Sequence, residues 1–196
     1  MTKDSFIVSL DEVKAGPELP FANQEHCMVK IDESTFAMIG GPNAIKGLHF
    51  YSRTTGLWST GPDMLFAHKS KFGCAIFEVH GSKAIAIVGG NTGNNGNSKV
   101  VEFFKLDSMT WERGPDLDRG LKEFALAVDK SGRILYAIGG VSSGSPSRGM
   151  VRVLDCSEGT CPATWTKYAD KVSDGGGFIN GGHVMVPDFF RDHKCS

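Results

Sequence analysis

Residues 84–90, Ala-Ile-Ala-Ile-Val-Gly-Gly, join a short apolar run to the glycine pair that ends it. The same pattern occurs as Phe-Ala-Met-Ile-Gly-Gly at 36–41 and as Leu-Tyr-Ala-Ile-Gly-Gly at 135–140. The three glycine pairs are Gly40-Gly41, Gly89-Gly90 and Gly139-Gly140. Their first members are 89 − 40 = 49 and 139 − 89 = 50 residues apart. This nearly constant period predicts a repeat architecture.

Two more markers follow the same period. A single tryptophan comes after each glycine pair, and Gly-Pro turns at 16–17, 61–62 and 114–115 open the repeats. Because a missing Cβ lets neighbouring sheets approach where a strand ends, we interpret the glycine pairs as packing positions. We interpret the tryptophans as large apolar plates between adjacent sheets. The tryptophans are Trp58, Trp111 and Trp165.

The repeat at 61–113 indicates what each unit builds. Residues 72–79 and 84–88 are apolar runs of strand length, and 99–105 and 110–113 are two further short strands. Turn residues separate these runs, and no segment has a capped apolar pattern of helical period. Four antiparallel strands in about 50 residues form one blade of a β-propeller. The chain is therefore predicted to be all-β.

We predict a single domain over 1–196 with three full four-stranded blades. The blades cover approximately 16–60, 61–113 and 114–168. Strands at 5–13 and 178–190 are expected to form partial blades at the two ends. These end pieces either combine into one composite blade or leave the ring incomplete.

The succession of apolar strand, Gly-Gly, aromatic pair and tryptophan resembles the kelch repeat. The aromatic pairs are Phe50-Tyr51 and Phe103-Phe104, and the resemblance covers about residues 16–170. It implies a kelch-type β-propeller that binds another protein through loops at one face. Kelch rings usually hold more than three blades. The resemblance therefore implies either an incomplete ring or self-association through open propeller edges.

The composition narrows the classes of function. The 196 residues are 40% hydrophobic and 22% charged, with a formal net charge of −1. This balance gives no general attraction to nucleic acid. No apolar run has the length of a transmembrane helix, so we expect no membrane insertion. The first ten residues lack the apolar core of a signal peptide, which indicates the cytoplasm if Met1 is the native start.

The five cysteines leave the compartment open. Cys156 and Cys161 flank a short loop, and they are either a small disulfide or two free thiols. Oxidation of this pair would indicate an extracellular protein. Cys27 and Cys74 occupy matched strand positions, where we expect buried small apolar side chains.

The candidate binding residues lie on loops that follow the glycine pairs and on turns that lead into the inner strands. Rigid scaffolds commonly present recognition residues on such loops. The basic members would form a rim that meets an acidic peptide, against the alternative of ordinary solvated loop charge. The candidates are Lys46, His68, Lys69, Asn94, Asn95, Arg119, Lys122 and Arg148.

The sequence contains no convincing catalytic or metal-binding motif. The six histidines form no paired metal-ligand spacing, and no nucleophile elbow occurs. Some proteins similar to kelch propellers are copper-radical oxidases, but the three tyrosines, at 51, 136 and 168, supply no counterpart of their crosslinked site. We therefore expect no cofactor and no enzyme activity, and we keep the oxidase as a remote alternative.

Two interpretations of function follow. The first is a non-enzymatic kelch-repeat protein, a scaffold that binds a protein partner of unknown identity. The alternative is an extracellular recognition or adhesion propeller with a Cys156–Cys161 disulfide. The redox state of this pair distinguishes the two.

Overall fold

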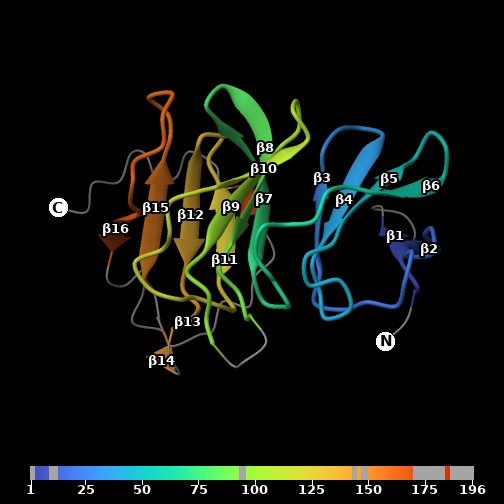
Figure 1. Ribbon diagram of the computed structural model, residues 1–196, viewed down its shortest axis with the longest axis horizontal. Helices are drawn as coiled ribbons and strands as arrows, with labels where there is room; N and C mark the ends of the chain where they lie inside the picture. Colours follow the sequence, from blue (N-terminus) through green and yellow to red (C-terminus); the bar gives the residue numbers. More distant parts are fainter. Residues whose placement is uncertain are drawn as a thin grey trace.

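The structure is a computed structural model that describes residues 3–8, 13–92, 96–142, 145–146, 150–169 and 184–185. Three sheets, each with four antiparallel strands in chain order, stand side by side (Figure 1). The described residues contain no helix. The predicted all-β fold is confirmed, and the arrangement fits a β-propeller-like fold.

In the first two sheets four consecutive strands pair in chain order, and in the third the small hairpin of β13 (Val141–Ser142) and β14 (Ser145–Pro146) interrupts the succession. The first sheet contains β3 (Cys27–Lys30), β4 (Thr35–Ile39), β5 (Leu48–Ser52) and β6 (Leu57–Thr60). The second contains β7 (Gly73–Val79), β8 (Ser82–Val88), β9 (Val101–Lys105) and β10 (Thr110–Arg113). The third contains β11 (Ala125–Val128), β12 (Ile134–Ile138), β15 (Val151–Asp155) and β16 (Thr166–Ala169).

The second sheet is buried on both faces because its side chains alternate between two apolar clusters. On β9, Phe104 packs toward the first sheet and Phe103 toward the third. On β8, Ile87 packs toward the first sheet and Ala86 toward the third. All four are at most 2% exposed. We call the cluster between the first and second sheets the first interface, and the one between the second and third sheets the second interface.

The tryptophans connect consecutive repeats. Trp111 Nε1 donates to the Pro62 carbonyl at 2.9 Å, and Trp165 Nε1 donates to the Pro115 carbonyl at 2.9 Å. The indole of Trp111 packs against the first interface, and Trp165 belongs to the second. Each ring therefore fills an interface and also holds the Gly-Pro turn that leaves the preceding sheet. Trp58 makes the same kind of bond, 2.8 Å long, to the Glu18 carbonyl.

The glycine pairs owe their repetition to backbone shape and to close packing. Gly89 and Gly90 have φ of +62° and +95°. The φ angles of the corresponding glycines in the other two pairs differ from these values by at most 10°. A Cβ on Gly89 would lie 2.6 Å from the Leu121 carbonyl oxygen, which belongs to the linker into the third sheet. Left-handed backbone and this contact both exclude larger residues.

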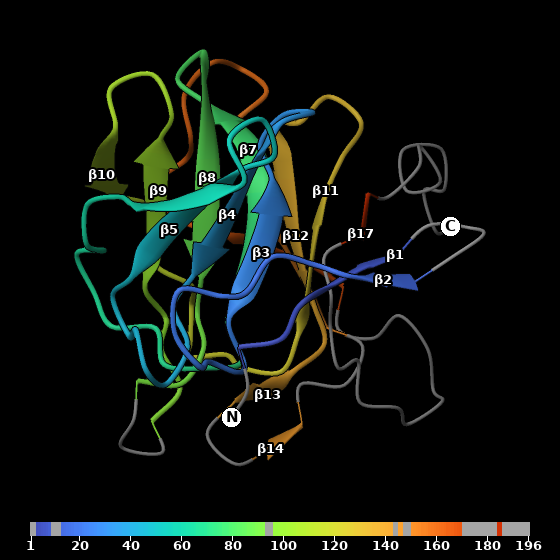
Figure 2. The ribbon, with the colours of Figure 1, turned by 90° about the vertical axis from the view of Figure 1, so that its right-hand side faces the viewer.

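The two chain ends compare differently with the prediction. β1 (Phe6–Val8) and β2 (Val13–Ala15) pair with each other in a two-stranded sheet separate from the three main sheets, so a partial blade at this end stays a prediction. β17 (Val184–Met185) pairs parallel to β11, so it adds a fifth strand to the third sheet instead of starting a fourth (Figure 2). The rest of the predicted strand 178–190 lies outside the described residues. No composite blade forms within the described chain.

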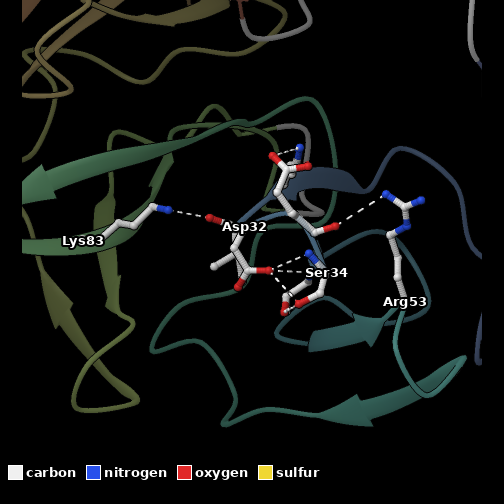
Figure 3. A network of polar contacts seen from close by, with 8 residues as sticks. Asp32, Ser34, Arg53 and Lys83 are labelled. Carbon is white, nitrogen blue, oxygen red and sulfur yellow. Dashed lines mark hydrogen bonds and ion pairs between the residues drawn. The ribbon is translucent and has the colours of Figure 1, made fainter.

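Short hairpins close one end of the sheets, which we call the hairpin end. In the β3–β4 turn, Asp32 Oδ1 accepts bonds from the backbone N–H of Ser34 at 2.7 Å and of Thr35 at 2.8 Å (Figure 3). The bonds from Ser34 are the main reason why the pKa of Asp32 is lowered. Lys83 Nζ, from the second sheet, donates to the Ile31 carbonyl. This end is thus held by bonds within the turns and by this link between the first two sheets.

Candidate functional site

The longer connections gather at the opposite end of the sheets. The segments that follow the glycine pairs bond to the linker that enters the third sheet: Gly90 N–H, from the second sheet, donates to the Leu121 carbonyl at 2.7 Å, and Lys122 N–H donates to the Val141 carbonyl of the third sheet at 3.1 Å. β13 (Val141–Ser142) and β14 (Ser145–Pro146) form a small hairpin there, at the lower edge of Figure 1. We call this end the loop face. Its described parts are 41–47, 61–72, 90–92, 96–100, 114–124 and 140–142.

Four of the predicted binding residues lie on the loop face with side chains that reach solvent. Lys46 and Arg119 are exposed, and Lys69 and Lys122 are half-buried. Lys46 Nζ donates to the Leu65 carbonyl at 2.9 Å, so part of its bonding capacity is already used. Three predicted residues lie outside the described residues: Asn94, Asn95 and Arg148.

The prediction for His68 is wrong, because this side chain is only 1% exposed. Its Nδ1 lies 2.8 Å from the Gly89 carbonyl oxygen, and its Nε2 lies 2.9 Å from Glu102 Oε1. A carbonyl oxygen can only accept, so Nδ1 carries a proton and donates. His68 therefore lies inside the first interface and joins the linker to two strands of the second sheet. Its position in a linker sequence suggested exposure, but the linker turns its side chain inward.

Glu102 is the partner that sequence reasoning missed. Its side chain is completely buried, and its Oε2 accepts a bond of 2.9 Å from the backbone N–H of Leu65. Both carboxylate oxygens therefore have partners. A signal was present in the sequence, because Glu102 interrupts the apolar run of β9 and a buried carboxylate requires a partner.

The equivalent positions in the other two sheets carry different groups. His68 is the seventh residue after the glycine of its Gly-Pro turn, and the corresponding residues are Asn23 and Leu121. Asn23 Nδ2 donates to the Gly40 carbonyl at 2.9 Å, just as His68 donates to that of Gly89. Leu121 is buried and has no polar group to offer. The third sheet therefore lacks the side-chain donor that the first two have.

Arg152 occupies the place in the third sheet that Glu102 occupies in the second. Each is the second residue of its sheet's third strand. Arg152 is 2% exposed, its Nε lies 2.5 Å from Asp118 Oδ1, and its Nη2 lies 3.7 Å from Met150 Sδ. Its Nη1 is buried and has no hydrogen-bond partner in the described part of the chain. The guanidinium is therefore incompletely satisfied.

Asp118 is bound from two sides. Its Oδ2 lies 3.4 Å from Arg119 Nε, while Oδ1 faces Arg152. Burial by itself would raise the pKa of Asp118, but hydrogen bonds and charge from the two arginines outweigh this and lower it. Asp118 is therefore ionised at neutral pH. Two guanidinium groups and one carboxylate leave this cluster with one net positive charge.

Two disulfides join strands and loops. Cys27 on β3 and Cys74 on β7 are bonded, with Cα atoms 6.2 Å apart, so a covalent link crosses the first interface. The expectation of two simple apolar side chains at these positions is therefore wrong. Cys156 and Cys161 form a second disulfide, with Cα atoms 4.2 Å apart, in the loop after β15. The matched strand positions of Cys27 and Cys74 were the available signal for the first bond.

A hollow of about 360 Å³ lies beside the second disulfide. Phe103, Pro115 and Cys161 contribute to its wall. His80 Nδ1 lies 3.6 Å from Glu112 Oε1, and Lys105 Nζ lies 2.7 Å from Glu112 Oε2. The neighbouring lysine already neutralises this carboxylate. Among the residues described, no group of three or more His, Cys, Asp or Glu side chains is placed to hold a metal ion.

Comparison with known proteins extends only to the fold. No family model matches the sequence, and no curated protein matches it. The structure is similar to a solved structure of YjhT, with a TM-score of 0.66 and 15% sequence identity. The match covers 84% of this chain and 57% of the YjhT chain. The chain thus spans little more than half the length of that protein, and the likeness at this identity concerns the fold alone. Among the described residues, no helix is long and apolar enough to cross a membrane.

Proposed function

We propose that the chain is part of a kelch-type β-propeller and acts as a non-enzymatic module that binds another protein through its loop face. The observation that carries the proposal is the division between the two ends of the sheets. Short turns close the hairpin end except at the 156–165 connection, whereas all the described connections of the loop face are longer segments, two of them with exposed Lys46 and Arg119. Loops that a rigid scaffold positions in this way are common recognition sites.

The expected partner presents acidic side chains. Lys69, Lys122 and Arg119 add positive charge to the loop face, and rim charges of this kind increase association rates and select partners more than they add affinity. Binding should therefore weaken as salt concentration rises. Absence of enzyme activity and of a cofactor belongs to the same proposal.

A second candidate is an extracellular version of the same binding function. The two disulfides favour it, because such bonds persist mainly in oxidising compartments. Mass measurement after alkylation, with and without prior reduction, tests this directly. Protection of Cys27, Cys74, Cys156 and Cys161 before reduction supports the extracellular version. Alkylation of all four of these cysteines in natively isolated protein, without prior reduction, would exclude it.

The binding function is tested by comparing two charge-reversal variants. Lys69→Glu with Lys122→Glu alters the loop face, and Lys83→Glu with Lys130→Glu alters the hairpin end as a matched control. Immobilised variants are exposed to extracts, and bound proteins are crosslinked and mapped. We expect a partner that is retained by the wild type and the control but lost from the loop-face variant. Partners that the two variants retain equally would contradict the proposal.

A further inference from the structure

We propose that Arg152 and Arg119 form a carboxylate-binding site at the loop-face end of the second interface. This inference rests on the proposed function, because it places one specific ligand group on the same face. The ligand is a carboxylate, carried either by a small acid or by a side chain of a protein partner.

The first argument is the comparison of equivalent positions. In the second sheet, both oxygens of the buried Glu102 carboxyl group have partners, His68 Nε2 and the Leu65 backbone N–H. In the third sheet, Arg152 is just as buried, but Leu121 stands where His68 would be. A leucine cannot accept the bond that Arg152 Nη1 offers. The repeat thus has a built polar position with one partner missing.

The second argument is the energetic cost of the missing partner. Leaving a buried donor unsatisfied costs about 1–3 kcal/mol, and more when the group is charged. Arg152 Nη1 has no partner among the described atoms, and its neighbour Nη2 has only the weak acceptor Met150 Sδ. A carboxylate is the acceptor that best suits a guanidinium, because both groups are planar and can form paired bonds.

The third argument is charge and access. The cluster of Arg152, Arg119 and Asp118 carries one net positive charge, which matches one further carboxylate. Arg152 is buried, but the side chains of Asp118 and Arg119 are 43% and 51% exposed. The ligand therefore approaches from the side of these two residues. Arg119 provides the exposed contact and Arg152 provides the buried one.

The test is calorimetric titration of the full chain with an acetylated, amidated triglutamate peptide, with the triglutamine peptide as control and sodium acetate as the small acid. We expect saturable binding of triglutamate and none of triglutamine. Binding of acetate as well would indicate a small acid, and binding of triglutamate alone would indicate a protein side chain. No saturable binding of either carboxylate would overturn the proposal.

Variants distinguish this site from general attraction by a basic face. The Arg119 side chain is exposed, so Arg119→Ala should leave the fold intact. We expect this variant to weaken triglutamate binding about tenfold or more. Arg152→Met should do the same, while Arg152→Lys keeps the charge but loses the fork, so it should fall between. Arg53→Ala, which removes an exposed arginine at the hairpin end, is the matched control and should change little. Equal losses in Arg119→Ala and Arg53→Ala would overturn the proposal.

The outcome also separates this inference from the proposed function. If a protein partner still requires the loop face but triglutamate binds no better than triglutamine, only the carboxylate site is wrong. If Arg119→Ala loses triglutamate while no loop-face partner exists, the site stands and the protein-binding function fails.

Discussion

The two interfaces are built on the same repeat but are completed differently. The first is crossed by the Cys27–Cys74 disulfide, and its buried carboxyl group at Glu102 has a partner on each oxygen. The second has no disulfide across it among the described residues, and its buried guanidinium at Arg152 keeps one donor unpaired. Equivalent backbone positions are therefore fully paired in one interface and incompletely paired in the other.

The largest expected effect comes from substituting two neighbouring residues of β9 that face different interfaces. Phe104→Ala creates a cavity in the first interface and Phe103→Ala creates one in the second. Each should lower the free energy of unfolding by about 3–5 kcal/mol, because both rings are almost fully buried. Denaturant unfolding gives the size of the loss.

Hydrogen exchange then locates the damage. We expect faster exchange in β3 and β7 for Phe104→Ala, and in β7 and β11 for Phe103→Ala. The disulfide should limit the opening in Phe104→Ala. Identical exchange patterns in the two variants would mean that the interfaces are not separate units.

The next effect concerns the disulfides. Removing Cys27–Cys74 with two alanines should cost about 4 kcal/mol, because the bond closes a loop of 47 residues. Removing Cys156–Cys161 should cost about 2 kcal/mol, because its separation is only 5. Thermal and denaturant unfolding of both double variants checks the order. A larger loss from the short loop would contradict the idea that the first bond secures an interface.

A smaller effect is expected from the buried pair of the first interface. His68→Leu leaves one oxygen of the buried Glu102 carboxyl group without a partner and should cost about 2 kcal/mol. Asn23→Leu removes an equivalent bond to a glycine carbonyl without leaving a buried carboxyl group unpaired, and should cost only about 1 kcal/mol. Equal losses in denaturant unfolding would show that the unpaired Glu102 oxygen is not the reason for the difference.

The tryptophan bonds should contribute less again. Trp111→Phe and Trp165→Phe each keep an aromatic ring in the interface. They lose the hydrogen bonds to the Pro62 and Pro115 carbonyls, respectively. We expect a loss of about 1 kcal/mol in either variant. A loss several times larger in thermal unfolding would indicate that ring volume, rather than the bond, dominates.

The smallest effect is the pH dependence that Asp118 gives to the second interface. Its pKa is lowered in the folded state, so its contribution is fully present above the ordinary aspartate pKa of about 4. The contribution is lost as pH falls below that value and through the lower folded pKa. Asp118→Asn should therefore flatten the decline of unfolding free energy as pH falls below about 4. An unchanged decline would show that Asp118 does not contribute to the pH dependence of the unfolding free energy.

The sequence predicted the repeat well because its markers have local physical causes. Gly89-Gly90 needs left-handed backbone, and Trp111 needs both an apolar interface and a nearby carbonyl. The site was harder to predict, because burial of a linker side chain depends on packing between sheets. His68 therefore looked like a surface residue, and Arg152 like an ordinary strand residue. Only the comparison of equivalent positions in space shows that one is paired and the other is not.

Hydrogen exchange with and without triglutamate tests the contrast between the interfaces most directly. We expect the peptide to slow exchange in 117–122 and at Val141, which surround the arginine cluster, while 64–69 and 89–91 at the first interface stay unchanged. Protection should disappear in Arg119→Ala. Equal protection at both interfaces, or none at the second, would contradict the account.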